Sequence, residues 1–543
     1  MKMKLSSIAA VLLLCVSCVE IDYRLGSGFL PIEQNRQVLT AEVPVDEIML
    51  GMPDSLSGYS NYRIVVGSIR DKDNNLSRRS GALTILPLLS ELDFGTGPEF
   101  KSFHLSLAHD TVSVADLDQQ NILQQLNVYE LDKPLDPLKD YDCNARPHHS
   151  ARIVSKSYPI LTGKDSLRID FTEEYAKKFF SLTADDLSDI DKYLAKIPGI
   201  YLESPDPMGV GGRFNSFEIQ FGYDATTVSL TGNYGILCFR STYEGVKVDT
   251  SFMFYVGAQK LYDVDSLLTN TSSGMPYPQY AMNYTDEEYS RSSTGVAGET
   301  FSIRGGGGIK PRISASRLKE AIRNTVSGMG INPDEIIMNK ATIILPFEFP
   351  DDYTQMFKYP LALSPTTRIR TDTSAMFMGL TDASSSTEDQ GDIDRNDMCY
   401  HPDFTFHMQE ILSAADSTIE KGNHDIWLMT MTYEITSEDN SNSELSELYE
   451  QMAYESYYQS MYGGYGGYGG YGGYGDYGGY NSYNNYYSYM MMAQYAGNNV
   501  SSYATLALDK DAYYNAVLNG PSYPDENRRP RIKFVFSAPR TVE

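Results

Sequence analysis

The chain has 543 residues and a formal net charge of −27, from 71 acidic and 44 basic side chains. A field of this sign repels nucleic acid and anionic lipid head groups, which argues against both as partners. The length is enough for two to four domains with their own cores.

The first 17 residues have the pattern of an export signal. Two lysines precede a short apolar run from Ile8 to Leu14, and Cys15-Val16-Ser17-Cys18 follows. The run is too short to span a bilayer, and a cysteine directly after a small residue resembles a bacterial lipobox. The pattern predicts removal of residues 1–17 and lipidation of Cys18. Cys18 fits better than Cys15, because the residue before Cys18, Ser17, is small, whereas the residue before Cys15, Leu14, is bulky. A plain secretory peptide is the alternative.

Residues 18–37 are polar and contain glycine, which predicts a flexible tether. Residues 38–258 predict a first β-rich domain. Its clearest strand is residues 103–108, where Phe103, Leu105 and Leu107 alternate with polar side chains, the period of a strand with one buried face. A helical interlude begins at the capping box of Thr183 and continues to Pro198. Glu244-Gly245 predicts a hairpin turn between two further strands.

Residues 259–300 are rich in Asn, Thr, Ser and Pro, which predicts a linker or a long surface loop. Residues 301–543 predict a second β-rich domain, with a helix over Ala315–Ser327, a short helix starting at Asn332 and a strand over Lys340–Phe349. The expected fold class is therefore mainly β, with β-sandwich or jelly-roll-like domains and a few packed helices. The glycines at 305–308 lack the Lys-Ser/Thr of a P-loop, which argues against phosphate binding there.

One short motif resembles a known family. Leu25-Gly26-Ser27-Gly28-Phe29-Leu30-Pro31, shortly after the lipidated cysteine, is similar to the start of Bacteroidota outer-membrane lipoproteins catalogued as domain of unknown function 4270. The resemblance continues in four further motifs: Val128-Tyr129-Glu130-Leu131, Ile197-Pro198-Gly199-Ile200-Tyr201, Asn339-Lys340-Ala341-Thr342-Ile343-Ile344-Leu345-Pro346 and Arg529-Pro530-Arg531-Ile532-Lys533-Phe534. It implies a lipid-anchored, β-rich envelope protein and supplies no catalytic residues to carry over.

An acidic stretch is the first candidate for ligand chemistry. Asp389, Asp392, Asp394 and Asn396 alternate oxygen ligands as a calcium loop does, but the central glycine and the closing glutamate of an EF-hand are missing. A structural calcium site and a solvated acidic loop are the two interpretations. No other cofactor is expected.

Histidines are the second candidate. His401 and His407, six residues apart, and His424 suggest a zinc or nickel site, yet this spacing fits neither a strand face nor a helix turn. A surface or helix-capping role is therefore favoured, and no metal site is assigned with confidence. The sequence also has no nucleophile elbow, zinc-protease motif or papain-like cysteine context. It predicts that the protein is not an enzyme.

The most unusual stretch runs from Met461 to Tyr480 and contains 11 Gly and 7 Tyr. It belongs to an insertion of about 438–500 between two strands of one sheet. Glycines maximise the entropy lost on ordering, which favours disorder. Regularly spaced tyrosines supply contact surface, so an interaction arm and a tolerated loop expansion both fit. The tyrosines are Tyr462, Tyr465, Tyr468, Tyr471, Tyr474, Tyr477 and Tyr480.

These features predict a noncatalytic lipoprotein, anchored in the outer membrane through its N-terminal lipid, with the cell surface favoured over the periplasmic face. The first functional hypothesis is a subunit of an outer-membrane assembly, secretion or uptake complex that contacts a β-barrel protein. The second is a surface module that binds a glycan or an extracellular matrix.

Overall fold

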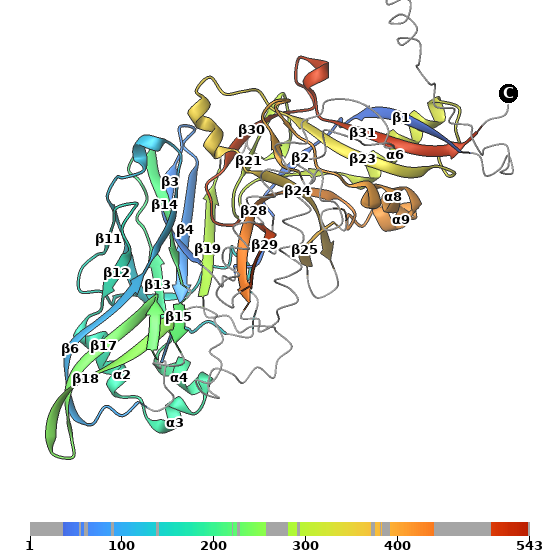
Figure 1. Cartoon of the computed structure of the whole chain (residues 1–543). Coiled ribbons are helices and arrows are strands. Elements are labelled where there is room, and N and C mark those ends of the chain that lie inside the picture. Colours follow the sequence, from blue (N-terminus) through green and yellow to red (C-terminus); the bar gives the residue numbers. More distant parts are fainter. Residues whose placement is uncertain are drawn as a thin grey trace, which may run out of the picture.

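The structure is a computed structural model that describes residues 36–540, except 54–55, 59–62, 88–91, 137–138, 140, 220, 225–228, 257–280, 290–293, 371–374, 381, 383–390 and 439–500. Strands far outnumber helices, which confirms the mainly β class. Two groups of sheets lie side by side (Figure 1). We call them the N-lobe, residues 63–256 and 281–289, and the C-lobe, residues 36–51 and 294–540.

The N-lobe is a sandwich of two antiparallel sheets. Apolar faces of both sheets, such as Val66 on β3 and Leu105 on β6, share one core with helix α2. The first sheet contains β10 (His149–Ile153), β9 (Asn127–Leu131), β13 (Ile200–Glu203), β4 (Leu76–Leu83), β3 (Arg63–Arg70), β14 (Gly211–Glu218), β7 (His109–Val114) and β19 (Ala281–Glu288). The second contains β12 (Leu167–Asp170), β6 (Thr96–Leu107), β17 (Tyr234–Tyr243), β18 (Val246–Val256) and β5 (Ile85–Pro87).

Smaller elements complete the N-lobe. They are the ribbons β8 (Gln124–Gln125) with β11 (Ile160–Leu161) and β15 (Phe221–Asp224) with β16 (Ser229–Gly232), the 3-10 turn η3 (Leu117–Gln119), and helices α2 (Glu173–Phe180), α3 (Ala184–Leu187) and α4 (Ile190–Lys196). The expected single helix over 184–197 is wrong. Asp189 accepts the backbone N–H groups of Asp191 and Lys192 and starts α4 as a separate helix.

The C-lobe is also built from two sheets around one core, to which Ile343, Phe534 and Leu428 contribute. The first sheet contains β1 (Arg36–Pro44), β31 (Arg531–Pro539), β23 (Ile337–Pro346), β27 (Cys399–Tyr400) and β26 (Ile393–Asp394). The second contains β20 (Gly295–Val296), β2 (Met49–Gly51), β22 (Lys310–Ile313), β28 (Ile426–Glu438), β24 (Ala362–Arg370), β25 (Ala375–Gly379) and β29 (Ser501–Leu508).

The remaining C-lobe elements are the ribbon β21 (Thr300–Arg304) with β30 (Asn515–Asn519), helices α6 (Ala315–Gly328), α8 (Thr405–Ser413) and α9 (Asp416–Ile419), and the 3-10 turns η5 (Tyr353–Lys358) and η6 (Glu526–Arg528). Helix α6 buries Leu318, Ile322 and Val326 on the face expected from their spacing. The short helix expected at Asn332 is wrong, because residues 333–335 form a turn. Within the described ranges no helix is long and apolar enough to cross a membrane.

The lobes do not follow the predicted domain boundaries. Strand β1, expected in the first domain, pairs along its whole length with β31, from Arg36 opposite Pro539 to Pro44 opposite Arg531. Strand β19, expected within a linker, pairs with β4 of the N-lobe. From Arg36 onward, the described chain therefore begins in the C-lobe, forms the N-lobe and returns to the C-lobe.

The insertion lies where the sequence placed it. Strands β28 and β29 pair antiparallel from Met431 opposite Leu508 to Glu438 opposite Ser501, so residues 439–500 connect two neighbouring strands. The seven tyrosines of the predicted interaction arm lie outside the described residues.

Candidate functional site

A groove of about 610 Å³ lies on the outer face of the first C-lobe sheet. Strand alternation forms it. On β23 the side chains of Ala341, Ile343 and Leu345 enter the core, so those of Lys340 and Thr342 face outward. On β31 the same alternation sends Ile532 and Phe534 inward and Arg531, Lys533 and Val535 outward.

Positive charge dominates the lining of this groove, which we call the basic groove. Lys340, Arg528, Arg531 and Lys533 line it, with Asp397 as the one lining carboxylate. The other lining residues are Thr342, Ile344, Pro346, Cys399, His401, Asn527 and Val535. No lining residue carries a Phe, Tyr or Trp ring, so the groove is suited to anionic groups rather than to stacking on sugar rings.

Two of the four cations are held in place by the protein. Arg528 donates to the carbonyl oxygens of Phe347 at 2.5 Å and Asp397 at 3.1 Å, and its Nε lies 3.2 Å from Glu348. Arg531 Nε lies 3.4 Å from Glu42 of β1. Lys340 and Lys533 extend from exposed positions of the strands. Lys533 lies opposite Glu42 of β1 in the strand register, so acidic side chains accompany the cations of the groove.

A second polar centre is buried between the lobes. We call it the junction cluster: Asp71, Arg79, Glu287, Arg304 and Lys310. Arg79 Nη1 lies 2.5 Å from Glu287 Oε1, with both side chains at most 3% exposed. Arg304 Nη1 lies 2.9 Å from Asp71 Oδ2, with both side chains 6% exposed. Because Asp71 belongs to the N-lobe and Arg304 to the C-lobe, the second pair joins the lobes directly.

Lys310 explains the glycine run at 305–308. Its ammonium group donates to the carbonyl oxygens of Arg304, Gly306 at 2.9 Å and Gly308 at 3.2 Å. Burial lowers the pKa of Lys310 to about 7, with Arg79 acting in the same direction and Glu287 opposing it. A Cβ on Gly305 would lie 2.2 Å from the Ala512 carbonyl oxygen. The run is a tightly packed junction loop, consistent with the prediction that it binds no phosphate.

Packed apolar side chains flank the junction cluster on two sides. Tyr513 of the C-lobe packs on Val65, Ile69 and Phe214 of the N-lobe. Cys143 of the N-lobe packs with Trp427 and Met429 of β28. The lobes therefore share an interface with both buried ion pairs and apolar contacts.

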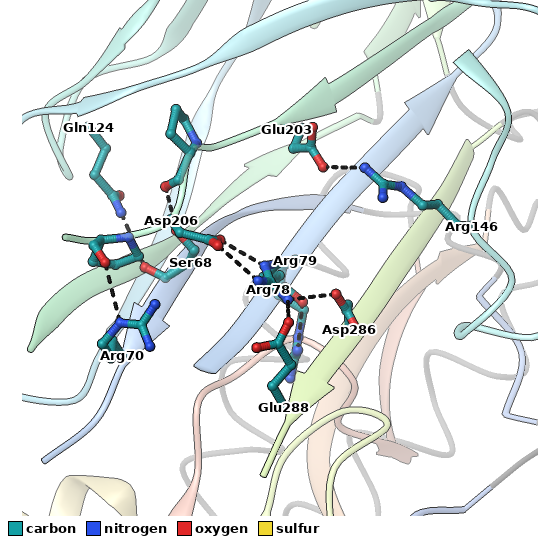
Figure 2. A network of polar contacts seen from close by, with 12 residues as sticks. Ser68, Arg70, Arg78, Arg79, Gln124, Arg146, Glu203, Asp206, Asp286 and Glu288 are labelled. Atoms are coloured by element: carbon teal, nitrogen blue, oxygen red, sulfur yellow. Dashed lines mark hydrogen bonds and ion pairs between the residues drawn. The ribbon is translucent and has the colours of Figure 1, made fainter. Parts of the chain in front are cut away.

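A surface network continues from the junction along β4 (Figure 2). Arg78 Nε lies 2.7 Å from Asp206, and its Nη1 lies 2.8 Å from Asp286 and 2.6 Å from Glu288 of β19. The hydrogen bond that Arg78 donates to Asp206 outweighs burial and raises the pKa of Arg78. Figure 2 also shows the Arg146–Glu203 pair, 2.8 Å apart. All four acids are engaged by arginine. Arg78 joins β4 to β19 and to the loop after β13, and Arg146 joins the segment before β10 to β13.

The predicted calcium ligands are only partly described. Asp389 lies outside the described residues. Asp394 accepts the backbone N–H groups of Asn396 at 2.8 Å and Asp397 at 3.0 Å, so it shapes the turn between β26 and β27. Asp392 forms a bridge with Ala362. Among the residues that the structure describes, no three His, Cys, Asp or Glu side chains form a group able to hold a metal. The calcium site stays a prediction.

The structure brings His407 and His424 together, with ring centroids 6.0 Å apart, and places His401 away from them. His401 lines the basic groove 3.7 Å from Asp394. His407 lies elsewhere, with Nε2 2.9 Å from the His424 carbonyl oxygen. Burial, aided by His407, lowers the pKa of His424. A further histidine, His149, stacks between Tyr129 and Tyr201, with ring centroids 4.7 and 4.6 Å away.

The three cysteines of the described chain, Cys143, Cys238 and Cys399, do not pair. Burial raises the pKa of Cys143 to about 11 and that of Cys399 to about 12. Both thiols therefore stay protonated at neutral pH and are poor nucleophiles. Cys18 lies outside the described residues.

Sequence reasoning missed the basic groove and the junction cluster. The signal for the groove was present in the sequence. Arg531 and Lys533 are two residues apart and so share one face of a strand, and Lys340 lies in another expected strand. The signal for the junction cluster was not, because a buried arginine resembles a surface arginine in sequence. Comparisons of the chain with protein-family models, curated proteins and solved structures found no match.

Proposed function

We propose that the protein is a noncatalytic lipoprotein, anchored in the outer membrane by a lipid on Cys18 and exposed at the cell surface, that serves as a subunit of an assembly, secretion or uptake complex. The observation that carries the proposal is the short apolar leader ending in Ser17-Cys18. The resemblance to envelope lipoproteins supports it. Two of the resembling motifs, 339–346 and 529–534, lie on the paired strands β23 and β31.

The shape of the molecule supports a binding role. Two sandwiches, joined through the buried Asp71–Arg304 pair and apolar contacts, present sheet faces and strand edges to solvent (Figure 1). Such faces contact a partner protein without local change in the backbone. A β-barrel protein of the outer membrane is the expected partner.

The anchor is tested by the substitution Cys18→Ala. The variant is expected to leave the membrane fraction, because no acyl chain is attached. Unchanged partitioning with outer membrane would contradict lipidation at Cys18. Protease shaving of intact cells that express the unaltered chain reports which side of the membrane the protein occupies.

The partner is tested by detergent extraction and affinity capture. Recovery of one β-barrel protein in stoichiometric amount supports the proposal. Retention of the soluble chain on a glycan array, without a barrel, would instead favour the glycan- or matrix-binding alternative, to which the regularly spaced tyrosines of the insertion point.

A further inference from the structure

Strand β1 lies at the end of its sheet without the features that usually protect such an edge (Figure 1). It has 9 residues, pairs with β31 in one regular register and has no other strand partner in the described part of the chain. The end strands of the other large sheets are short or bulged. Strands β20 and β26 have 2 residues, β5 has 3, β12 has 4 and β25 has 5, and register shifts interrupt the pairing of β7 and β10. A long, regular edge offers its unpaired backbone groups to another strand.

One hydrogen bond shows which backbone groups of β1 point outward. Directly after β1, the N–H of Val45 donates to the carbonyl oxygen of Pro530, the residue before β31, at 3.0 Å. Because the direction of the N–H and C=O groups alternates along a strand, the odd-numbered residues of β1 point theirs toward β31. The even-numbered residues point theirs out of the sheet. Pro44 has no N–H and ends this row, so the outward N–H donors belong to residues 36, 38, 40 and 42.

The side chains along this edge are complementary to those of a second copy. Arg36 lies at one end of β1 and Glu42 near the other, both exposed on the outer face of the sheet. When two copies of β1 lie antiparallel with Leu39 opposite Leu39, Arg36 of each copy lies opposite Glu42 of the other. Opposite charges across an antiparallel pair stabilise it, and like charges destabilise it. A shift by two residues would place Arg36 opposite Pro44 or Thr40, so the charges favour one register.

The contacts that Arg36 and Glu42 already make are compatible with this pairing. Arg36 Nη1 donates to the carbonyl oxygens of Glu335 at 2.9 Å and Ser537 at 3.2 Å. Glu42 Oε2 lies 3.4 Å from Arg531 Nε, and the Glu42 side chain is 49% exposed. Each contact uses a single atom of the charged group, whereas a guanidinium has further N–H donors and a carboxylate has a second oxygen. An ion pair between copies would therefore add to these contacts.

We propose that the outer edge of β1 pairs with the same edge of a second copy of this chain, with Leu39 on the twofold axis. Backbone hydrogen bonds then join residues 36–42 of the two copies, and the first C-lobe sheets become one continuous sheet. The contact uses the same surface of both copies, as the closed interface of a twofold dimer does. Neither the lipid nor a barrel protein takes part in it, so the inference goes beyond the proposed function and does not depend on it.

The test is sedimentation velocity of the purified full chain in a nonionic detergent, over a range of protein concentrations. At about 0.15 M salt, repulsion between two copies is largely screened over distances beyond about 8 Å, although each carries a net charge of −27. We expect the unaltered chain to form a dimer that dissociates on dilution. Arg36→Glu places two carboxylates opposite each other at both ends of the contact, and Glu42→Arg places two guanidinium groups there. Each variant alone should dimerise about tenfold more weakly.

Mixing the two variants in equal amounts separates an effect on the contact from an effect within each chain. In a mixed pair an acid again lies opposite a base at both ends, so dimers should reappear, although each chain keeps its own substitution. Lys101→Glu, which reverses a charge at an exposed lysine of the N-lobe, is the matched control and should dimerise as the unaltered chain does. Circular dichroism confirms that each variant is folded.

Cysteine substitutions test the register. Leu39→Cys should form a disulfide-linked dimer under copper-phenanthroline oxidation, because residue 39 lies opposite itself across the axis. Gln37→Cys, which also points its backbone groups toward β31 but would lie opposite Ala41, should remain at the level of the unaltered chain. An unaltered chain that stays monomeric at every concentration would overturn the proposal. Failure of the mixture to recover dimers, equal weakening by Lys101→Glu, or equal linking of both cysteine variants would also overturn it.

Discussion

At the scale of single residues, the junction between the lobes depends on charges that are removed from water. Arg79 illustrates the balance. Burial lowers the pKa of Arg79, but Glu287 more than compensates and the pKa is raised overall. Breaking one partner of such a pair leaves an uncompensated buried charge, which costs far more than an exposed pair contributes.

Asp71→Asn tests the pair that joins the lobes. Asparagine keeps an oxygen for the backbone N–H groups of Asp73 and Asn75, which Asp71 Oδ1 accepts, but removes the charge opposite Arg304. We expect the free energy of unfolding to fall by about 3–5 kcal/mol in urea titrations. Asp249→Asn, which breaks the exposed pair with Arg240, is the control and should change the free energy of unfolding little. Equal effects of the two substitutions would show that burial of the Arg304 pair is unimportant.

Lys310 predicts a pH dependence. Its pKa is about 7 in the folded chain and the ordinary value of 10.5 when unfolded. Between these values the unfolded chain binds more protons, so the free energy of unfolding should rise with pH, by up to ~1.4 kcal/mol per pH unit. Below pH 7 the cost of burying the ammonium is fully present.

The measurement is urea unfolding at pH 7 and at pH 9, for the unaltered chain and for Lys310→Met. The free energy of unfolding should rise less between pH 7 and pH 9 in the variant than in the unaltered chain, whatever the absolute stability of the variant. The same slope in both chains would assign the pH dependence to other groups.

At the scale of elements, the loop between β21 and β22 must pass close to the backbone of the segment before β30. Gly305→Ala places a methyl group 2.2 Å from the Ala512 carbonyl oxygen. We expect a loss of about 1–3 kcal/mol in the free energy of unfolding, measured by denaturant titration. Gly328→Ala at the end of α6 meets no atom within 4 Å and should stabilise by about 0.5–1 kcal/mol. Loss of stability in both variants would point to a general intolerance of added side chains.

The insertion between β28 and β29 gives a second prediction for elements. Deleting residues 461–480 shortens a connection of 62 residues, 439–500, to 42. The entropy of loop closure varies with the logarithm of loop length, so the deletion should raise the free energy of unfolding by roughly a few tenths of a kcal/mol. The melting temperature should therefore change little or rise slightly.

Thermal denaturation measures this effect. Unfolding of the C-lobe on deletion would mean that the tyrosines pack as core. If stability holds and partner capture is lost, the insertion is a binding arm, and replacing the seven tyrosines with serine should reproduce the loss.

At the scale of the whole molecule, the shared interface should make the two lobes unfold together. The junction cluster and its flanking apolar contacts couple them. Calorimetry of the unaltered chain should show one main transition, and Arg79→Ala with Arg304→Ala should separate it into two. A single transition in the double variant would show that apolar contacts alone couple the lobes.

Local features of the sequence determined the mainly β class, the helix α6, the hairpin at Glu244-Gly245 and the place of the insertion. Each of these features depends on residues close together in the sequence, through the spacing of apolar side chains and the residue types that turns require. Strand β4 was not predicted. Arg78 and Arg79 interrupt its apolar pattern, and only the acids of β19 and of the loop between β13 and β14 make their burial acceptable.

Only the tertiary structure decided which strands pair. Strand β1 lies about 500 residues from β31 in sequence, as the Arg36 to Ser537 hydrogen bond shows, and the period of β1 encodes its buried face but not its neighbour. The pairing of β23 with β31 assembles the basic groove, because each of these strands supplies cations that are unremarkable alone. The sequence by itself therefore determined the mainly β class and the local elements, whereas the joining of distant strands decided the lobes and the groove.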